Sequence, residues 1–297
     1  MPKRTVCIQN PAKLSVRNSS LMIEQGTEMA SVPLEDIWVV IIETHRAQVT
    51  AKALSSIVDA GIGVMTCGTN HMPNGLLLPL GAHSRHAAIV EDQLLVSTSL
   101  RKRLWQRIVV AKIRNQASVL ELTGKDASLV SLHAAKVLSG DASGRESAAA
   151  SAYFRQMLPH GTRRNGPYSA SLDYGYTVLR AGVARAAVAG GWLVSRGIHH
   201  SSDLNAFNLV DDLIEPFRPV VDLDVVRLDL RAPLSSASRK QLASVFEHLV
   251  ICGGKRMTVQ SAINRELETL RDAVVEKDAG QLLLPSVTEF AYAELGE

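Results

Sequence analysis

The chain has 297 residues, of which 46% are hydrophobic and 21% are charged, and its 32 Lys and Arg against 29 Asp and Glu leave a formal net charge of +3. A chain of this length usually divides its core, so we expect two domains, and no segment reaches the about 18 uninterrupted apolar residues of a membrane span. The composition therefore excludes membrane-spanning and disordered proteins, and it leaves any nucleic-acid binding to local clusters of cations.

The cysteines and the N-terminus indicate the compartment. Cys7, Cys67 and Cys252 lie far apart in the sequence, among apolar neighbours. This arrangement suits buried, reduced thiols better than disulfide bonds or a zinc cluster. The first residues, MPKRTVCIQN, contain no apolar stretch of signal-peptide length. We therefore expect a cytoplasmic protein.

Residues 1–80 predict a small β-rich domain. Short runs of β-branched and aliphatic residues alternate with turn sequences such as NPA, RNSS, QGT and MPNG. One helix interrupts these runs, because Thr50 can cap its start and Gly61 can end it. The expected strands are RTVCI, KLSV, SLMIE, IWVVIIE, IGVMTC and LLLPL.

The pattern changes near residues 80–86 to a long helical periodicity that continues to the end of the chain. This change places the domain boundary there and predicts a larger all-α domain over residues 86–297. The fold class is therefore α+β, with the β-rich domain first. The expected helices are residues 87–96, 99–122, 126–139, 145–158, 169–195, 206–217, 236–251 and 258–277.

The second of these helices carries a stripe of arginines. Arg103, Arg107 and Arg114 fall on one narrow face, opposite the face that carries Trp105 and Val109. A basic stripe of this kind can follow the phosphate backbone of a nucleic acid. It can equally be a solvated helix face, and the sequence does not decide between the two.

Glu146, in the helix GRESAAASAYFRQML, is a first candidate for chemistry. Helical spacing from Glu146 reaches Ala149, Tyr153 and Met157, so the carboxylate lies in line with the stripe that should pack. A carboxylate in that position needs a partner or a metal to compensate its burial. Alternatively, its place near the helix start keeps it hydrated and favourably oriented in the helix dipole.

The stretch FNLVDDLIEPFRP, residues 207–219, places acids inside an apolar helix. Asp211, Asp212 and Glu215 fill one arc beside the apolar arc. Because residues three and four apart on a helix are neighbours, Asp212 and Glu215 could bind one cation or share a proton. Pro216 removes a backbone hydrogen bond, so we expect a kink or a helix end just beyond Glu215. A solvated acidic face is the alternative.

Two histidines lead into this acidic helix. His199 and His200 follow Gly197 in the loop GIHHSSDLNAF. Imidazole and carboxylate together suit Mg²⁺ or Mn²⁺ sites that keep open positions, and the absence of cysteine nearby argues against structural zinc. Glu, His and Glu would make a suitable ligand set, although a single histidine is more often a surface or core residue.

Several of these stretches occur together and in order. In chain order they are AKLSV, the strand that ends in IIE, MPNG before LLLPL, LWQRIVVAKIRNQ at residues 104–116, the Glu146 helix with its YF pair, LDYGYTVLR at residues 172–180, and DLIEPFRP with His200 upstream. Together they resemble the CRISPR-associated protein one family, the adaptation integrase. The resemblance covers nearly the whole chain and looks closest to the type II systems.

The resemblance implies a β-rich N-terminal domain joined to a helical catalytic domain. It also implies that Glu146, His200 and Glu215 are the metal ligands and catalytic residues, with Mg²⁺ or Mn²⁺ as cofactor. His200 is preferred to His199 because the family spaces its ligand histidine and the acid of DLxE as His200 and Glu215 are spaced. Asp212 matches another acidic position of the motif, which would support the site or hold a second ion.

The resemblance further implies an activity and partners. The protein would insert spacer DNA into a repeat array by attack of a DNA 3′-hydroxyl on a phosphodiester, while the metal stabilises the developing charge. With water as the nucleophile, the same site would cut DNA. The expected partners are double-stranded DNA, a second copy of the chain with contacts through the N-terminal domain, and CRISPR-associated protein two in a larger complex. No membrane partner is expected.

Two positions depart from the family pattern. Relatives commonly carry Asn where this chain has Ser169 and Asp173, which affects the hydrogen bonding expected near the site but not the ligand set. Asp211 is expected to face solvent. The loop and helix-end cations that could hold phosphates are Arg163, Arg164, Arg218, Lys255 and Arg256.

Two other functions stay open. A metal-dependent nuclease of DNA repair would use the same ligands mainly for hydrolysis. A catalytically silent DNA-binding scaffold would use the basic stripe, and its acids would be structural. Glu146→Ala and Glu215→Ala separate the two classes, because the scaffold would keep its DNA binding and its function in both variants.

Overall fold

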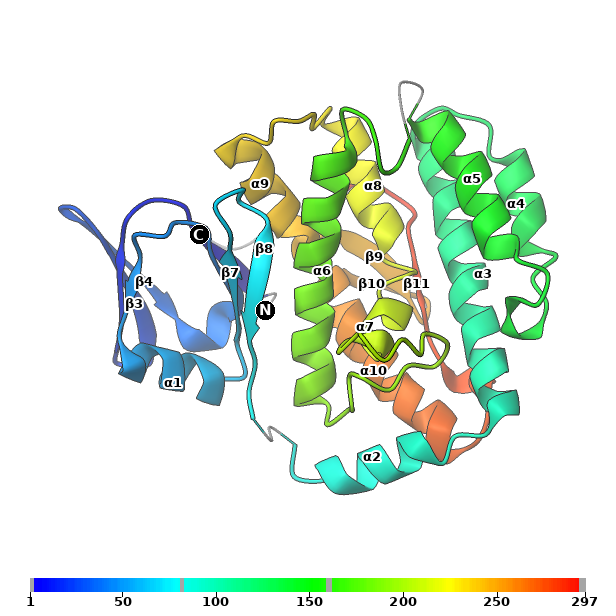
Figure 1. The fold of residues 1–297 in the computed structure, drawn as a ribbon, viewed down its shortest axis with the longest axis horizontal. Coiled ribbons are helices and arrows are strands. Elements are labelled where there is room, and N and C mark those ends of the chain that lie inside the picture. The colour runs from blue at the N-terminus through cyan, green and yellow to red at the C-terminus, as the bar shows by residue number, and fades with distance from the viewer. Residues whose placement is uncertain (1–2, 81–82, 159–161, 294–297) are drawn as a thin grey trace.

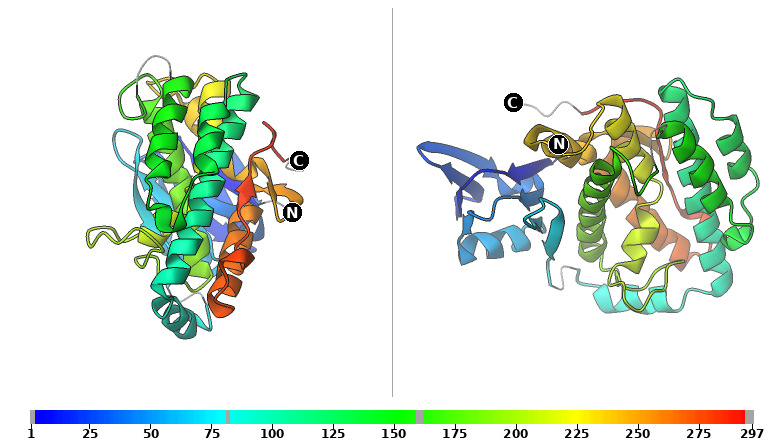
Figure 2. Two further views of the ribbon diagram at one scale, coloured as in Figure 1. Left: turned by 90° about the vertical axis from the view of Figure 1, so that its right-hand side faces the viewer. Right: turned by 45° about the horizontal axis from the view of Figure 1, so that its top comes forward.

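The structure is a computed structural model that describes residues 3–80, 83–158 and 162–293. Figure 1 shows a β-rich region, in blue and cyan, beside a larger helical region that ends in red. The right-hand view in Figure 2 shows the same division. Helix α6 (Ser169–Ala189) lies on the side of the helical region that contacts strands β7 and β8.

Two four-stranded sheets build the β-rich region. In the first sheet β1, β5 and β7 run parallel, and β8 is antiparallel to β7 at the edge. In the second sheet β4, β3 and β2 are antiparallel neighbours, and β6 runs parallel to β2. The bounds are β1 Arg4–Ile8, β2 Lys13–Arg17, β3 Ser20–Gln25, β4 Glu28–Pro33, β5 Ile37–Ile42, β6 Gln48–Val49, β7 Gly63–Cys67 and β8 Pro73–Leu77.

Most of the predicted elements of this region are confirmed. Helix α1 (Ala51–Asp59) begins as expected, since Oγ1 of Thr50 accepts the N–H of Ala53 at 3.1 Å. The predicted MPNG turn is wrong, because the chain turns at residues 69–71 and Pro73–Leu77 is already strand β8. The sequence also misses β4, whose exposed residues give no apolar run.

The helical region begins with α2 and continues through α10. Its helices are α2 His86–Leu94, α3 Thr98–Leu122, α4 Ser128–Ala134, α5 Arg145–Met157, α6 Ser169–Ala189, α7 Asn208–Leu213, α8 Arg218–Arg227, α9 Ser236–Ala243 and α10 Val259–Val275. Short 3₁₀ turns lie at Leu34–Asp36, Ser139–Asp141, Ser244–Glu247 and Ala279–Gln281. Within the described parts of the chain, none of the helices combines the length and hydropathy that crossing a lipid bilayer would require.

The α+β class is confirmed, but the prediction that the second region is all-α is wrong in one place. Strands β9 (Leu249–Cys252), β10 (Lys255–Thr258) and β11 (Pro285–Ser286) form a small antiparallel sheet in the order β10-β9-β11. The sequence predicts a single helix over residues 236–251, whereas α9 ends at Ala243. The residues of β9 alternate between half-buried and buried, which is the period of a strand.

One hydrophobic core joins the two regions. Trp38 and Met65 of the first sheet belong to the same buried cluster as residues of α3 and α6. Glu43, just after β5, is 2% exposed and accepts the hydroxyl of Tyr174 at 2.6 Å and Nε–H of Arg239 at 2.8 Å. The β-rich region is therefore fixed to α6 and α9 by a buried, fully partnered carboxylate as well as by apolar packing.

The division into domains 1–80 and 86–297 stays a prediction. Strand β8 is followed by α2, so the change of element type falls where the periodicity places it. Residues 81–82, inside the predicted boundary, lie outside the described residues.

Candidate active site

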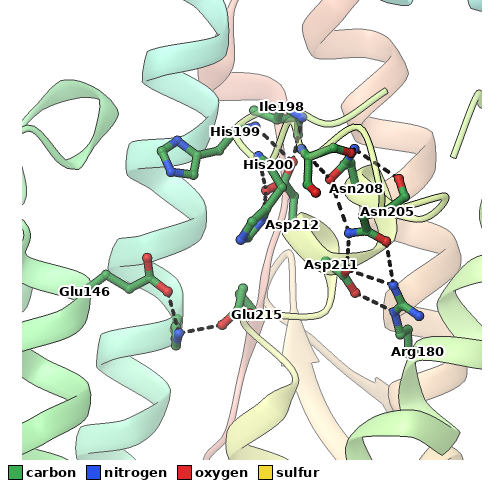
Figure 3. A network of polar contacts seen from close by, with 12 residues as sticks. Glu146, Arg180, Ile198, His199, His200, Asn205, Asn208, Asp211, Asp212 and Glu215 are labelled. Atoms are coloured by element: carbon green, nitrogen blue, oxygen red, sulfur yellow. Dashed lines mark hydrogen bonds and ion pairs between the residues drawn. The ribbon is translucent and has the colours of Figure 1, made fainter. Parts of the chain in front are cut away.

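Three elements that are far apart in the sequence meet at one lysine. Lys112, in α3, places its Nζ 2.6 Å from Oε1 of Glu146 in α5 and 2.5 Å from Oε2 of Glu215, which follows α7. Figure 3 shows the two carboxylates approaching this amine from opposite sides. The side chains of Lys112 and Glu215 are 11% and 7% exposed, and that of Glu146 is 28% exposed. Two predicted ligands are thus brought together with an ammonium group between them.

Glu146 is held at the start of α5. Gly144 precedes the helix with φ at 60°, a conformation that favours glycine. The carboxylate of Asp141 accepts the N–H groups of Arg145 and Glu146 at 2.8 and 3.0 Å. These bonds satisfy two of the amides that a helix start leaves without partners. The carboxylate of Glu146 is consequently half-buried at a fixed helix terminus.

Glu215 lies in the break between α7 and α8. A helix end is expected just beyond Glu215, but it comes before that residue, since α7 ends at Leu213 and α8 begins at Arg218. The carbonyl of Pro216 accepts Nδ2–H of Asn115 at 2.7 Å. Asn115 also donates to the carbonyl of Pro285 at 3.0 Å and accepts the N–H of Val287 at 3.1 Å. Helix α3 therefore braces both the break that carries Glu215 and the C-terminal strand β11.

His200 is oriented by Asp212. The carboxylate of Asp212, which is 0% exposed, accepts the backbone N–H groups of Ile198, His199 and His200 at 2.6, 2.9 and 3.2 Å. It also lies 2.7 Å from Nδ1 of His200, and this hydrogen bond raises the pKa of His200 above its ordinary value. With Nδ1–H donating to Asp212, the lone pair of a neutral imidazole is on Nε2, the atom that can bind a metal.

The loop before α7 is closely fitted around Asp212. A Cβ added to Gly197 would lie 2.3 Å from the carbonyl oxygen of His200 and 2.7 Å from Oδ2 of Asp212, so glycine is required there. The side-chain amide of Asn208 donates to carbonyls on both sides of the loop, at 3.0 and 2.9 Å. The position of His200 is therefore set by the backbone of the loop and not by its side chain alone.

His199 anchors the loop and faces away from the carboxylates. Its ring stacks on Trp105 of α3, with centroids 4.3 Å apart and planes inclined by 2°. Figure 3 shows His199 directed to one side and His200 directed toward Glu215. The two neighbouring histidines of the loop are therefore directed differently, and His200 is the one directed toward Glu215.

The prediction that Asp211 faces solvent is wrong. Its Oδ1 lies 2.6 Å from Nε of Arg180 and its Oδ2 lies 2.9 Å from Nη2 of the same residue, a bidentate pair. Asn205 donates to Oδ2 at 2.7 Å. Burial raises the pKa of Asp211, but Arg180 and Asn205 outweigh it and hold the pKa below its ordinary value.

Lys112 and Glu215 each stabilise the ionised form of the other. Burial lowers the pKa of Lys112, yet Glu215 and Glu146 outweigh burial and raise that pKa above its ordinary value. Burial raises the pKa of Glu215, yet Lys112 and Arg218, whose Nε is 2.8 Å from Oε1, hold the pKa below its ordinary value. Both contacts of Glu215 are close but poorly directed for hydrogen bonds, so they act mainly through charge.

Two cavities open on Glu215. They have volumes of about 260 and about 300 Å³ and share Arg163, Tyr176, Glu215 and Arg218 as lining residues. The guanidinium groups of Arg163 and Arg218 each lie 4.7 Å from the centroid of the Tyr176 ring. Two cations are thus held beside a carboxylate, an arrangement that can bind a phosphate group. The smaller cavity also reaches Lys112.

Ser169 and Asp173, the positions that depart from the family, take no direct part in the site. Asp173 pairs with Arg163 at 2.6 Å, and the buried hydroxyl of Ser169 has no hydrogen-bond partner among the residues described. Neither contacts Glu146, His200 or Glu215 through a hydrogen bond or ion pair in those parts of the chain.

The basic stripe of α3 has a structural use. Arg103 donates to the carbonyl of Lys277 at 3.4 Å, and Arg107 donates to the carbonyl of Leu282 at 2.9 Å. These contacts tie α3 to the chain that follows α10. Neither of the two interpretations, a nucleic-acid surface or a purely solvated face, accounts for them.

The cysteine prediction is confirmed. Cys7, Cys67 and Cys252 are free thiols, two of them buried and Cys7 half-buried. Burial raises their pKa values to about 12, about 12 and about 11. Such thiols remain protonated and unreactive at neutral pH.

The donor groups of the site suit a divalent cation, but their present positions do not form a complete ion-binding site. Two carboxylates and an imidazole nitrogen are donors that Mg²⁺ and Mn²⁺ accept. Across residues 3–80, 83–158 and 162–293, however, no three His, Cys, Asp or Glu side chains already surround a common point that could hold an ion. The ammonium of Lys112 stands where Glu146 and Glu215 converge and supplies positive charge there.

Lys112 and Asn115 are site residues that the sequence reasoning misses, although both lie in LWQRIVVAKIRNQ. A signal was available for the lysine. Helical spacing from Trp105 and Val109, which are buried, reaches Lys112 on the same stripe. A charged residue in a packing stripe is the criterion that singles out Glu146, and it applies equally here.

Sequence comparison finds relatives along nearly the whole chain. Residues 6–238 match the family model described as CRISPR associated protein Cas1. The chain is 39% identical over 295 residues to the CRISPR-associated endonuclease Cas1 of Neisseria meningitidis serogroup C (strain 8013), and the match covers 97% of each chain. It is 24% identical over 285 residues to the CRISPR-associated endonuclease Cas1 2 of Pyrobaculum aerophilum, covering 89% of this chain and 96% of that one.

Solved structures share the fold. A casposase bound to integration product has a TM-score of 0.74 at 17% identity, covering 94% of this chain and 92% of that chain. A Cas1 protein from Thermotoga maritima has a TM-score of 0.74 at 15% identity, covering 92% and 97%. A chain of a Cas6-RT-Cas1–Cas2 complex has a TM-score of 0.72 at 17% identity, covering 94% and 36%.

Proposed function

The chain belongs to the Cas1 family of CRISPR-associated proteins, the endonuclease and integrase family of CRISPR adaptation, and we propose that Glu146, His200 and Glu215 perform this chemistry with Mg²⁺ or Mn²⁺. The reaction inserts spacer DNA into the repeat array. The observation that carries the proposal is the convergence of Glu146 and Glu215, from separate elements, on one cationic point, with His200 held beside them.

The residues of the site have separate tasks in this reaction. Asp212 fixes the ring of His200 with Nε2 available as a ligand. Arg163 and Arg218 flank Glu215 and can hold the phosphate that is attacked. When bound, the metal ion would polarise the phosphodiester and stabilise negative charge on its oxygens.

The bond changes follow from this geometry. A bond forms between the incoming DNA 3′-oxygen and phosphorus, and the bond between phosphorus and the leaving oxygen breaks. The attacking hydroxyl loses its proton to solvent, and the leaving oxygen takes up a proton. If water attacks in place of the hydroxyl, the same site cuts DNA. Strand transfer and cleavage are therefore two outcomes of one arrangement.

Other cations extend the proposed DNA surface to different degrees. Arg164 is exposed and next to Arg163, so it can follow the same strand. Lys255 is also exposed, but on β10. Arg256, on the same strand, pairs with Glu289 at 2.6 Å and lines neither of the two cavities that Arg163 and Arg218 line. We therefore place Arg163, Arg164 and Arg218 at the DNA and leave Lys255 and Arg256 outside the proposal.

The proposed partners are double-stranded DNA, a second copy of the chain and Cas2. Support comes from solved proteins of the same fold, which include a casposase bound to integration product and the Cas6-RT-Cas1–Cas2 complex. The β-rich region leaves β4 and β8 as edge strands with backbone groups that can pair with another chain. The homodimer contact is proposed for this region.

A strand-transfer assay tests the function. A labelled short duplex with free 3′-hydroxyls is incubated with a supercoiled plasmid that carries the host repeat array, with Mn²⁺ or Mg²⁺, in the presence and absence of Cas2. We expect label to become covalently joined to the plasmid. Glu215→Ala and Glu146→Ala should each reduce joining by about 10³-fold or more, because each removes a proposed ligand of the metal ion that would stabilise charge on the reacting phosphate.

Glu121→Ala is the matched control, since Glu121 is exposed on α3 and lies outside the cluster. Nicking without joining would favour the repair nuclease. DNA binding with undiminished function in both site variants would favour the silent scaffold. Melting curves of the variants exclude loss of fold as the cause of lost joining.

A further inference from the structure

Lys112 is the residue of the site that the proposed reaction does not use. Its Nζ forms ion pairs with both Glu146 and Glu215. Among the residues described, Glu146 forms no ion pair with any other side chain, whereas Glu215 also contacts Arg218. Removing the ammonium would leave two carboxylates facing each other with the cation of Arg218 on one side only.

The two contacts of Lys112 differ in kind. It donates a hydrogen bond to Oε1 of Glu146, while its approach to Oε2 of Glu215 is close but poorly directed. An ammonium is a compact point charge on a flexible, unbranched stem, so it can pair with carboxylates in many directions. Its place between the carboxylates is therefore set by a hydrogen bond to Glu146 and by charge toward Glu215.

We propose that Lys112 is an internal counter-cation, which holds Glu146 and Glu215 in the positions of ligands while no divalent ion is bound and competes with the ion for both carboxylates. This inference rests on the proposed metal site and adds to it a residue that sets the affinity for the ion. It assigns Lys112 a positioning role, with no part in the bond changes.

A cavity beside Lys112 could accommodate the ammonium group when a metal ion displaces it. This cavity of about 260 Å³ borders Lys112 and Glu215, and its other lining residues include Gln116, Phe154 and Tyr176. A lysine stem can turn within such a space without moving the helix backbone. In that cavity the ammonium would still lie near the phosphate that Arg163 and Arg218 are proposed to hold.

Binding of Mn²⁺ to the metal-free protein tests the inference without an activity assay. Full-length wild type, Lys112→Met and Lys112→Gln are stripped with EDTA, dialysed and titrated with Mn²⁺, and the free ion is measured by electron paramagnetic resonance. Both variants should bind Mn²⁺ at least about tenfold more tightly than wild type, a difference of about 1.4 kcal/mol. Their melting temperatures should fall in EDTA and recover with Mn²⁺.

Lys102→Met is the control, because Lys102 is exposed on the same helix. It should match wild type in both measurements. Glu215→Ala in the wild-type background should abolish the tight site, which identifies where the ion binds.

The remaining outcomes are decisive as well. If wild type binds Mn²⁺ through Glu215 and the folded variants bind it equally or more weakly, the role of Lys112 is overturned and the proposed function stands. If neither wild type nor the folded Lys112 variants bind Mn²⁺, both proposals fail, whereas binding by the variants alone supports the inference. Variants that are unfolded in EDTA but folded in millimolar Mn²⁺ support the inference, and variants that stay unfolded in Mn²⁺ contradict it.

Discussion

Two regions of the molecule bury a glutamate in opposite ways. At the candidate site, Glu215 is 6% exposed and lies between Lys112 and Arg218, which hold its pKa below the ordinary value although burial opposes them. In α10, Glu266 is 0% exposed and neither carboxylate oxygen has a hydrogen-bond partner among the described residues. Burial raises the pKa of Glu266 well above its ordinary value.

The difference shows that partners, and not burial alone, decide the charge of a buried carboxylate. At the site Lys112 and Arg218 stabilise the ionised form of Glu215, which is the form that could bind a metal ion. In α10 the acid is without such partners and favours its neutral form. Three variants can break or sharpen this contrast.

Asp212→Ala should have the largest effect. It leaves the amides of Ile198, His199 and His200 without their acceptor in the interior of the loop. Loss of a buried charged acceptor of several donors typically costs about 3–5 kcal/mol of unfolding free energy. Urea unfolding measures the change, and Asp203→Ala, at an exposed position of the same loop, is the control. A loss no larger than that of the control would mean that Asp212 does not hold the loop.

Glu266→Gln should change how stability depends on pH. Because the pKa of Glu266 is raised in the folded protein, its stabilising contribution is complete below the unfolded pKa and is lost as pH rises toward the folded pKa. Within that window wild type should lose up to about 1.4 kcal/mol per pH unit relative to the variant. Unfolding is measured from pH 4 to pH 8. Glu268→Gln, exposed on the same helix, should run parallel to wild type, and a parallel course for Glu266→Gln would contradict the assignment.

Arg180→Ala should have the smallest effect of the three. It removes the bidentate partner of Asp211, but the pair is partly solvated, with side chains 34% and 19% exposed. We expect a loss of about 0.5–1 kcal/mol in unfolding free energy, since solvent screening reduces the value of the pair. Arg196→Ala, at an exposed position, is the control. A loss as large as that of Asp212→Ala would show that partial exposure does not weaken the contact.

Much of the fold was predictable because its signals are local. The apolar runs of β1, β2, β3, β5 and β7 and the cap at Thr50 can each be recognised within a few residues. The sequence misses α8 because Pro216 and Pro219 flank its start and because Asp222 and Asp224 interrupt its apolar pattern. Both aspartates are buried, so the rule that charged residues face solvent fails there for tertiary reasons.

The candidate site was predictable in its residues but not in its contacts. Glu146, His200 and Glu215 follow from motifs and the family resemblance. The pairing of Asp211 with Arg180 and of both glutamates with Lys112 depends on helices that meet only in the folded chain. No spacing rule within one helix can show such contacts.

The spacing of residues along helix α3 determines the contacts that the helix makes at the site. The ring of Trp105 stacks on His199, Nζ of Lys112 pairs with the two carboxylates, and Asn115 donates to the carbonyl of Pro216. All three residues lie on one uninterrupted helix. Each residue advances a helix by about 100°, so one residue inserted between Trp105 and Asn115 would turn one of these contacts away from its partner. Substitutions on the exposed face of α3 should therefore be tolerated far better than any change in its length.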